Sequence, residues 1–230
     1  YKSDSPFAAD VKFFPTENLY ILSENMTAEK WNNITDLLAS HKDEKYDGII
    51  IAHGTDTLAY SAAMFSIILN STDVPVFFVS SNKRPDLPEA NGNDNFRYAV
   101  ECICRGIRPN VYVTYRNITD GRMYLHLGSR IKQCSDYSED FFSFGAVDIT
   151  DNSDEAFKKY FAELDRMYPK KLSEKKREEL FIEIKEKAVS IGIKSCANNL
   201  CVSPKSNNKT ATICPTYLVT TLFSKCLHHR

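Results

Sequence analysis

The sequence predicts an α/β protein built on a three-layer, doubly wound, mostly parallel sheet. A run of β-branched residues follows Asp47-Gly48 and predicts a buried strand at 49–53. Apolar residues then recur at three- and four-residue steps through 55–69, which is typical of a helix. Further strands and a helix follow at the spacing of strand–helix–strand crossovers, which favours parallel pairing.

The other elements of this layout are predicted in the same way, one after another along the chain. Apolar positions from Trp31 to Leu38 give one face of a helix over 27–41. After the strand at 49–53 and the helix at 55–69 come four segments: a strand at 74–80, a loop rich in Pro, Asn, Asp and Gly at 81–94, a helix at 95–105 and a strand at 111–115. In open sheets of this kind ligands bind beyond the carboxyl ends of the strands. That rule points to His53–Thr57, Ser80–Arg84 and the loop after Tyr115.

The pattern changes near residue 150, so we divide the chain into an α/β domain over 1–150 and an appendage over 151–230. Residues 151–187 are dense in Lys and Glu with apolar residues at helical spacing, and we expect two amphipathic helices broken near Pro169. Beyond about residue 190 the periodicity is too weak to predict a fold.

Composition excludes several classes of partner. Of the 230 residues 43% are hydrophobic and 26% charged, and the formal net charge is −1, so no long-range field favours nucleic acid. The apolar runs are too short to span a bilayer. The seven cysteines form no Cys-x-x-Cys pair, and we expect no metal. Residue 1 is Tyr, and we therefore expect that the natural start has been removed or that the chain is a fragment. We expect the protein in the cytoplasm.

Residues with chemical potential gather where the strand at 49–53 passes into the next helix. Gly54 permits a sharp turn there. Thr55 is expected at the N-cap, where its hydroxyl meets unpaired backbone N–H groups, and Asp56 in the first turn, where negative charge is favoured. A substrate carboxylate or oxyanion is favoured at the same place. On these residues alone, Thr55 and Asp56 have a second interpretation, in which they only cap the helix.

The stretch from Asp47 to Tyr60, Asp-Gly-Ile-Ile-Ile-Ala-His-Gly-Thr-Asp-Thr-Leu-Ala-Tyr, resembles the second active-site signature of the bacterial-type L-asparaginases. That family also contains glutaminases and an amidotransferase subunit that releases ammonia from glutamine. The resemblance implies the fold of the family's N-terminal domain. It implies substrate contacts from His53, Gly54, Thr55 and Asp56.

The resemblance continues on both sides of this stretch. Ser23-Glu24-Asn25-Met26-Thr27 followed by Trp31 resembles a family segment whose serine holds the substrate α-carboxylate, which implies that role for Ser23 and a substrate contact for Glu24. Ser80–Pro85, then Asn91-Gly92 and Asn95, resemble a family loop, with Ser81, Lys83 and Asn91 departing from its pattern. Gly128–Lys132 before Asp140-Phe141 and Ser143 resembles the stretch that contains the catalytic lysine, which implies that role for Lys132. Taken alone, Lys132 would be an ordinary exposed lysine.

The resemblance implies Thr55, Asp56 and Lys132 as catalytic residues for hydrolysis of the side-chain amide of L-asparagine, with glutamine as a second substrate. A lysine with a depressed pKa can take the proton of a threonine hydroxyl or a water, which are poor nucleophiles otherwise. Asp56 would orient Lys132 and pair with the substrate ammonium. We expect these three side chains to converge on one pocket. The family also implies a homo-oligomer and no cofactor.

One family feature has no match. Tyr1–Leu22 contains no glycine, and so none of the Gly-Gly-Thr-Ile segment that supplies the family's primary threonine nucleophile. We therefore expect little or no asparaginase activity from these 230 residues. An alternative is a catalytically dead homologue that serves as a ligand-binding or oligomerisation module. A nucleotide-binding α/β domain is a third possibility, disfavoured because neither Gly-x-Gly-x-x-Gly nor a Walker motif is present.

Overall fold

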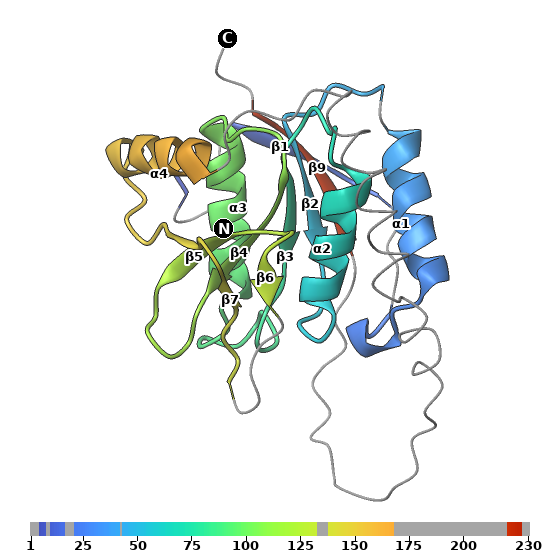
Figure 1. Cartoon of the computed structure of the whole chain (residues 1–230), viewed down its shortest axis with the longest axis horizontal. Coiled ribbons are helices and arrows are strands. Elements are labelled where there is room, and N and C mark those ends of the chain that lie inside the picture. Colours follow the sequence, from blue (N-terminus) through green and yellow to red (C-terminus); the bar gives the residue numbers. More distant parts are fainter. Residues whose placement is uncertain are drawn as a thin grey trace, which may run out of the picture. The chain divides into compact units, whose positions relative to one another are not determined.

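In the part of the chain that the structure describes, seven strands form a central sheet in the order β1-β9-β2-β3-β4-β5-β8, and β6 pairs with β7 in a separate hairpin (Figure 1). This computed structural model describes residues 5–7, 10–16, 21–41, 43–132, 138–167 and the backbone of 220–226. The strands are β1 (Val11–Pro15), β2 (Gly48–Ala52), β3 (Val76–Val79), β4 (Val111–Arg116), β5 (Met123–Leu127), β6 (Ile131–Lys132), β7 (Phe142–Ser143), β8 (Val147–Asp148) and β9 (Thr220–Cys226). The helices are α1 (Ala28–Ser40), α2 (Leu58–Ile68), α3 (Gly92–Cys104) and α4 (Asp154–Met167), with a 3-10 turn η1 (Ser23–Asn25) before α1.

The centre of the sheet is parallel. β2 pairs with β3 and β3 with β4 in parallel register, so Ile50, Phe77 and Tyr112 lie side by side. β5 and β9 run against their neighbours, whereas β1 and β8 each pair with one of those reversed strands and so run with the central three. Five of the seven strands therefore share one direction, which confirms the predicted mostly parallel α/β sheet.

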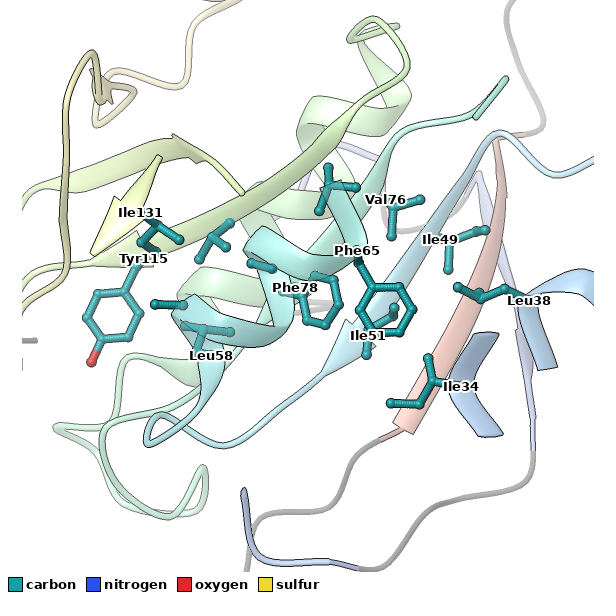
Figure 2. Packing of buried hydrophobic residues seen from close by; sticks show 14 of the residues in the cluster. Ile34, Leu38, Ile49, Ile51, Leu58, Phe65, Val76, Phe78, Tyr115 and Ile131 are labelled. Atoms are coloured by element: carbon teal, nitrogen blue, oxygen red, sulfur yellow. The ribbon is translucent and has the colours of Figure 1, made fainter. Parts of the chain in front are cut away.

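Helices α1 and α2 cover one face of this sheet (Figures 1 and 2). Ile34 and Leu38 of α1 and Leu58, Ala62 and Phe65 of α2 are buried against the strands. Alternate strand residues complete this core, because successive side chains of a strand point to opposite faces. They are Ile49, Ile51, Val76, Phe78, Val111, Val113 and Tyr115. Burial of each large apolar side chain of this kind contributes about 1.5–3 kcal/mol to folding.

Helix α3 covers the opposite face, which completes the predicted three layers. Gly48 belongs to this face, and a Cβ added there would lie 2.7 Å from Cδ1 of Ile103, so the glycine is what lets α3 approach β2. Arg105, at the end of α3, joins α4 to this layer. Its guanidinium bonds the Asp154 carboxylate at 2.9 Å and lies over the Phe157 ring.

Helix α3 begins at Gly92 and not at residue 95 as predicted. The Asn91-Gly92 pair has the composition of a turn, but the Gly92 N–H donates to the Ser81 hydroxyl at 3.1 Å, which satisfies a donor at the start of the helix. A Cβ at Gly92 would lie 2.6 Å from that hydroxyl oxygen. The close approach requires glycine, and the helix starts there for that reason.

The sheet receives one strand from a distant part of the sequence. β9 lies between β1 and β2 and is antiparallel to both. No periodicity in this region predicted a strand. α4 confirms the first of the two charged helices, and the second, beyond Pro169, lies outside the described residues. The division into 1–150 and 151–230 stays a prediction, because most of the second range is not described. None of the helices within the described ranges combines the length and apolar character that a bilayer crossing requires.

Gly128, in the turn after β5, packs closely against α2, and a substitution there can test this packing. A Cβ at Gly128 would lie 2.8 Å from the backbone oxygen of Ala62, which cannot move without displacing α2. We expect Gly128→Ala to lower the free energy of unfolding by about 1–3 kcal/mol, measured by urea titration. Ser129→Ala, at the exposed next position, is the control and should change it by less than about 0.5 kcal/mol. Equal stabilities of the two variants would contradict this packing.

Candidate active site

The turn that carries His53, Thr55 and Asp56 lies at the carboxyl end of β2, beside the carboxyl end of β3. The backbone N–H of His53 donates to the Val79 carbonyl at 2.8 Å, which extends the β2–β3 ladder by one residue. The turn His53–Thr57 therefore begins beside Ser80, at the end of β3. This is the edge at which open α/β sheets bind ligands.

Helix α2 begins later than predicted, which corrects the positions of Thr55 and Asp56. The N-cap is Thr57, so neither Thr55 nor Asp56 lies at the N-cap or in the first turn. The Thr57 hydroxyl does not cap the helix, because it donates to the backbone oxygen of Ser23 at 2.8 Å. Thr57 thus ties the turn to η1, and Thr55 and Asp56 stand in the connection before the helix. Capping alone therefore does not account for Thr55 and Asp56.

Ser23 and Asp56, which are 33 residues apart in sequence, meet in the fold. The Ser23 hydroxyl donates to Oδ2 of Asp56 at 2.9 Å. Ser23 is buried while Asp56 is exposed and Thr55 half-buried, so the carboxylate faces outward from a fixed serine. Glu24, the next residue of η1, is exposed and has no described hydrogen bond to this pair.

His53 is buried beneath this turn and its two ring nitrogens are used within the protein. Nδ1 lies 2.7 Å from the Gly54 carbonyl oxygen, which can only accept, so Nδ1 carries the proton. Nε2 then accepts from the Ser61 hydroxyl at 2.9 Å, and the Ser61 oxygen accepts from the Trp31 indole at 2.9 Å. Burial lowers the pKa of His53 to about 4, so the ring is neutral near neutral pH. This chain of hydrogen bonds joins α1, α2 and the turn, and a contact between the ring and a substrate stays a prediction.

Lys132 lies on β6, in the hairpin beside α2. Its neighbour Ile131 packs into the α2 core, whereas the Lys132 side chain is exposed. In the part of the chain that the structure describes, no hydrogen bond or ion pair joins Lys132 to Thr55 or Asp56. The expected convergence of these three side chains therefore stays a prediction.

Buried asparagines organise the neighbouring strand ends. The side-chain oxygens of Asn82 and Asn91 each accept the other residue's backbone N–H, at 3.0 and 2.9 Å, which closes the loop between β3 and α3. Asn95 donates to the Ser80 carbonyl and accepts from the Arg116 N–H, so it joins the ends of β3 and β4.

Sequence reasoning placed Asn82, Asn91 and Asn95 in a family-like loop and pointed to the turn that ends at Thr57, but it gave no role to Ser61 or Asn117. Ser61 had no sequence signal, because its partner Trp31 is 30 residues away. Thr57 lies in the recognised motif, but its bond to Ser23, 34 residues away, had no sequence signal. For Asn117 the one usable signal in the sequence was its position directly after a buried strand.

The arrangement offers a half-buried hydroxyl, a serine-held carboxylate and the start of a helix. Unpaired N–H groups at a helix start favour a carboxylate or an oxyanion. An outward carboxylate favours a cation, so the site suits a small molecule with both charges. Over the described ranges, no group of three His, Cys, Asp or Glu side chains is placed to hold a metal ion.

Comparison with known proteins gives consistent matches. A family model described as the N-terminal part of asparaginase matches residues 5–158. A glutamyl-tRNA(Gln) amidotransferase subunit from Methanosarcina acetivorans is 32% identical over 122 residues, 53% of this chain and 28% of the relative. The corresponding subunit from Methanosarcina mazei is 31% identical over 146 residues (61% and 34%), and that from Haloquadratum walsbyi is 34% identical over 130 residues (56% and 29%). The chain thus spans about a third of the length of these relatives.

Two solved structures are also similar. L-asparaginase I from Vibrio cholerae matches with a TM-score of 0.45 and 29% identity, over 53% of this chain and 35% of that one. The thermostable L-asparaginase from Thermococcus kodakarensis matches with a TM-score of 0.45 and 28% identity, over 55% and 37%. The residues matched by the family model include each motif on which the sequence resemblance was based.

The buried imidazole predicts how stability depends on pH. The unfolded chain binds a proton at His53 below about pH 6.5, whereas the folded pKa is about 4, so the folded state loses stability as pH falls through this window. We expect His53 to account for about 2 kcal/mol of the loss between pH 7.5 and pH 5. His53→Gln should flatten the profile by that amount, measured by urea unfolding at several pH values. Burial also lowers the pKa of His126 to about 3, so the variant should still lose stability as pH falls, because His126 is still present. Parallel profiles for the variant and the parent would refute this assignment.

Proposed function

Because the family model covers residues 5–158 of the 230, this chain belongs to the asparaginase family, and we propose that it binds an amino-acid amide and hydrolyses the side-chain amide. The substrate is L-asparagine or L-glutamine. The observation that carries the proposal is the Ser23–Asp56 pair beside the start of α2, because it sets a hydroxyl and a carboxylate where a strand ends.

The charges of an amino acid fit this pair. The Asp56 carboxylate is exposed and can pair with the substrate α-ammonium. The Ser23 hydroxyl and the N–H groups at the start of α2 would hold the α-carboxylate. Glu24 and Gly54 border the same place, and Glu24 would favour the ammonium group.

The half-buried Thr55 stands next to Asp56 and is the proposed catalytic hydroxyl. Attack on the side-chain carbonyl forms a tetrahedral oxyanion, ammonia leaves with a proton, and water then releases the acid. Lys132 would take the proton from the attacking hydroxyl or water. Its place in the proposal comes from the family match and not from a described contact.

The choice between the two amides rests on the relatives. The curated relatives named above are glutamyl-tRNA(Gln) amidotransferase subunits, whereas the matching family model is that of asparaginase. Both substrates are therefore part of the test. The homo-oligomer expected from the family stays a prediction.

A second candidate is a homologue that binds the ligand without hydrolysing it. The observation in its favour is that Lys132 is exposed, with no hydrogen bond or ion pair to Thr55 or Asp56 among the described residues. Binding and turnover must therefore be measured separately.

The test is ligand binding combined with ammonia release. We expect L-aspartate, the product, to bind the 230-residue chain in a calorimeter, and Asp56→Ala to weaken binding at least about tenfold, since a charge-assisted bond contributes about 1.5–3 kcal/mol. Asp73→Ala removes another exposed carboxylate, beyond the other end of α2, and is the control that should leave binding unchanged.

Ammonia release from asparagine and glutamine then separates the two candidates. Hydrolysis that Thr55→Ala reduces about 100-fold or more supports the enzyme. Binding without release supports the second candidate. Absence of binding to aspartate, asparagine and glutamine alike would overturn both.

A further inference from the structure

The segment Glu139–Phe141, which leads into β7, is joined to the carboxyl end of β4 and the residues after it by several hydrogen bonds. Asp140 is 3% exposed, and its Oδ1 accepts the backbone N–H groups of Ile118 and Thr119 at 2.6 and 3.3 Å. Asn117, also 3% exposed, accepts the Phe141 N–H at 3.1 Å and donates to the Phe141 oxygen at 3.2 Å.

Three further contacts hold the same segment, two from Tyr115 of β4 and one from the loop after β3. The Tyr115 hydroxyl donates to the backbone oxygen of Glu139 at 2.8 Å, and the Phe141 ring packs edge-on against Tyr115 with centroids 4.8 Å apart. Asn82, itself locked to Asn91, donates to the Glu139 carboxylate at 2.9 Å. A segment tied in this way cannot shift without breaking several buried or half-buried bonds at once, and bonds shielded from water are costly to break.

The fixed position of Phe141 also fixes β7, which begins at the next residue and is one strand of the β6–β7 hairpin. β7 starts at Phe142, and Phe142 is the register partner of Lys132 on β6. The other limb is held by α2, because Ile131 packs into the core and Gly128 lies against the Ala62 backbone. Lys132 therefore sits in a hairpin whose two limbs are anchored to β4 and to α2, the helix that follows Thr55 and Asp56.

We propose that Asp140 and Asn117 are positioning residues for the reaction: they clamp Phe141, and through the β6–β7 pairing they set where Lys132 stands relative to the Thr55–Asp56 turn. This inference rests on the proposed function. In this proposal the buried Asp140 carboxylate does not contact the substrate but holds the base, Lys132, within reach of the Thr55 hydroxyl. A displacement of about 1 Å at a catalytic group can cost about 100-fold in rate.

The test uses Asp140→Ala in the full chain, with two companion variants. Asp140→Asn keeps an oxygen that can accept the two N–H groups, and it should therefore retain the activity that Asp140→Ala loses. Asp120→Ala is the matched control. Asp120 lies in the β4–β5 turn, beside the Ile118 and Thr119 N–H groups that Asp140 binds, and it also accepts a backbone N–H, from Arg122. It is exposed, however, and its described bonds do not reach Glu139–Phe141.

We expect Asp140→Ala to lower kcat for amide hydrolysis about 10- to 100-fold with KM within about threefold, because binding at Ser23 and Asp56 is untouched. Asp140→Asn should recover most of kcat, and Asp120→Ala should match the parent. An unchanged kcat, or a loss that falls on KM alone, would overturn the positioning role.

A second readout does not depend on turnover. Hydrogen exchange at the amides of residues 131–132 and 142–143 should become at least about tenfold faster in Asp140→Ala, while exchange in β2 and β3 stays the same. Exchange that is unchanged in the hairpin would overturn the clamp, whether or not the chain hydrolyses amides. An inactive parent chain with a loosened hairpin would refute the catalytic proposal and leave the clamp established.

Discussion

The parallel pairing of β2, β3 and β4 is the constraint on which the rest of the domain depends. Each of these strands is buried between helical layers, and their side chains are almost wholly apolar. A parallel sheet of this kind has no solvent-exposed face, so polar groups are confined to the strand ends. Ser23, Asp56 and the asparagine network all lie at the carboxyl ends for this reason.

The strand ends leave backbone groups without partners, and the asparagines supply them. Where a buried strand stops, its last N–H and C=O groups lose their ladder partners and must be paired by other means. Asn95 pairs with the Ser80 carbonyl and the Arg116 N–H, and Asn117 does the same for Phe141. Uncharged amide side chains suit this task, since each offers a donor and an acceptor without placing a net charge in the interior. The polar surroundings of the site are thus also what completes the fold.

The layered core could be predicted because its pattern is local. The β-branched run of β2 and the helical spacing in α1 and α2 are visible within a few residues, and the structure follows them. The starts of α2 and α3 were wrong by three residues each, because they depend on distant partners, Ser23 for Thr57 and Ser81 for Gly92. Lys132 shows the other limit. A motif identifies the residue, but the direction of an exposed side chain on a two-residue strand depends on what packs around it.

His53 shows how a motif residue can be shared between fold and function. Its ring is bonded to Gly54 and Ser61 beneath the turn, so the motif histidine supports the backbone from which Thr55 and Asp56 project. The same side chain that makes the motif recognisable is therefore also a structural support of the turn.

The insertion of β9 between β1 and β2 has a consequence for how the protein is made. β1 and β2 are synthesised long before β9, yet in the described structure they are joined in the sheet only through residues 220–226. A ribosome releases the chain from its N-terminus, so the pairing of β2 with β9 that the structure describes can form only after residues 220–226 have been added. Non-local strand pairing of this kind is slow and leaves an edge open to other chains. In the described sheet, residues 220–226 therefore cover an edge of β2 that would otherwise be open to pairing with other chains.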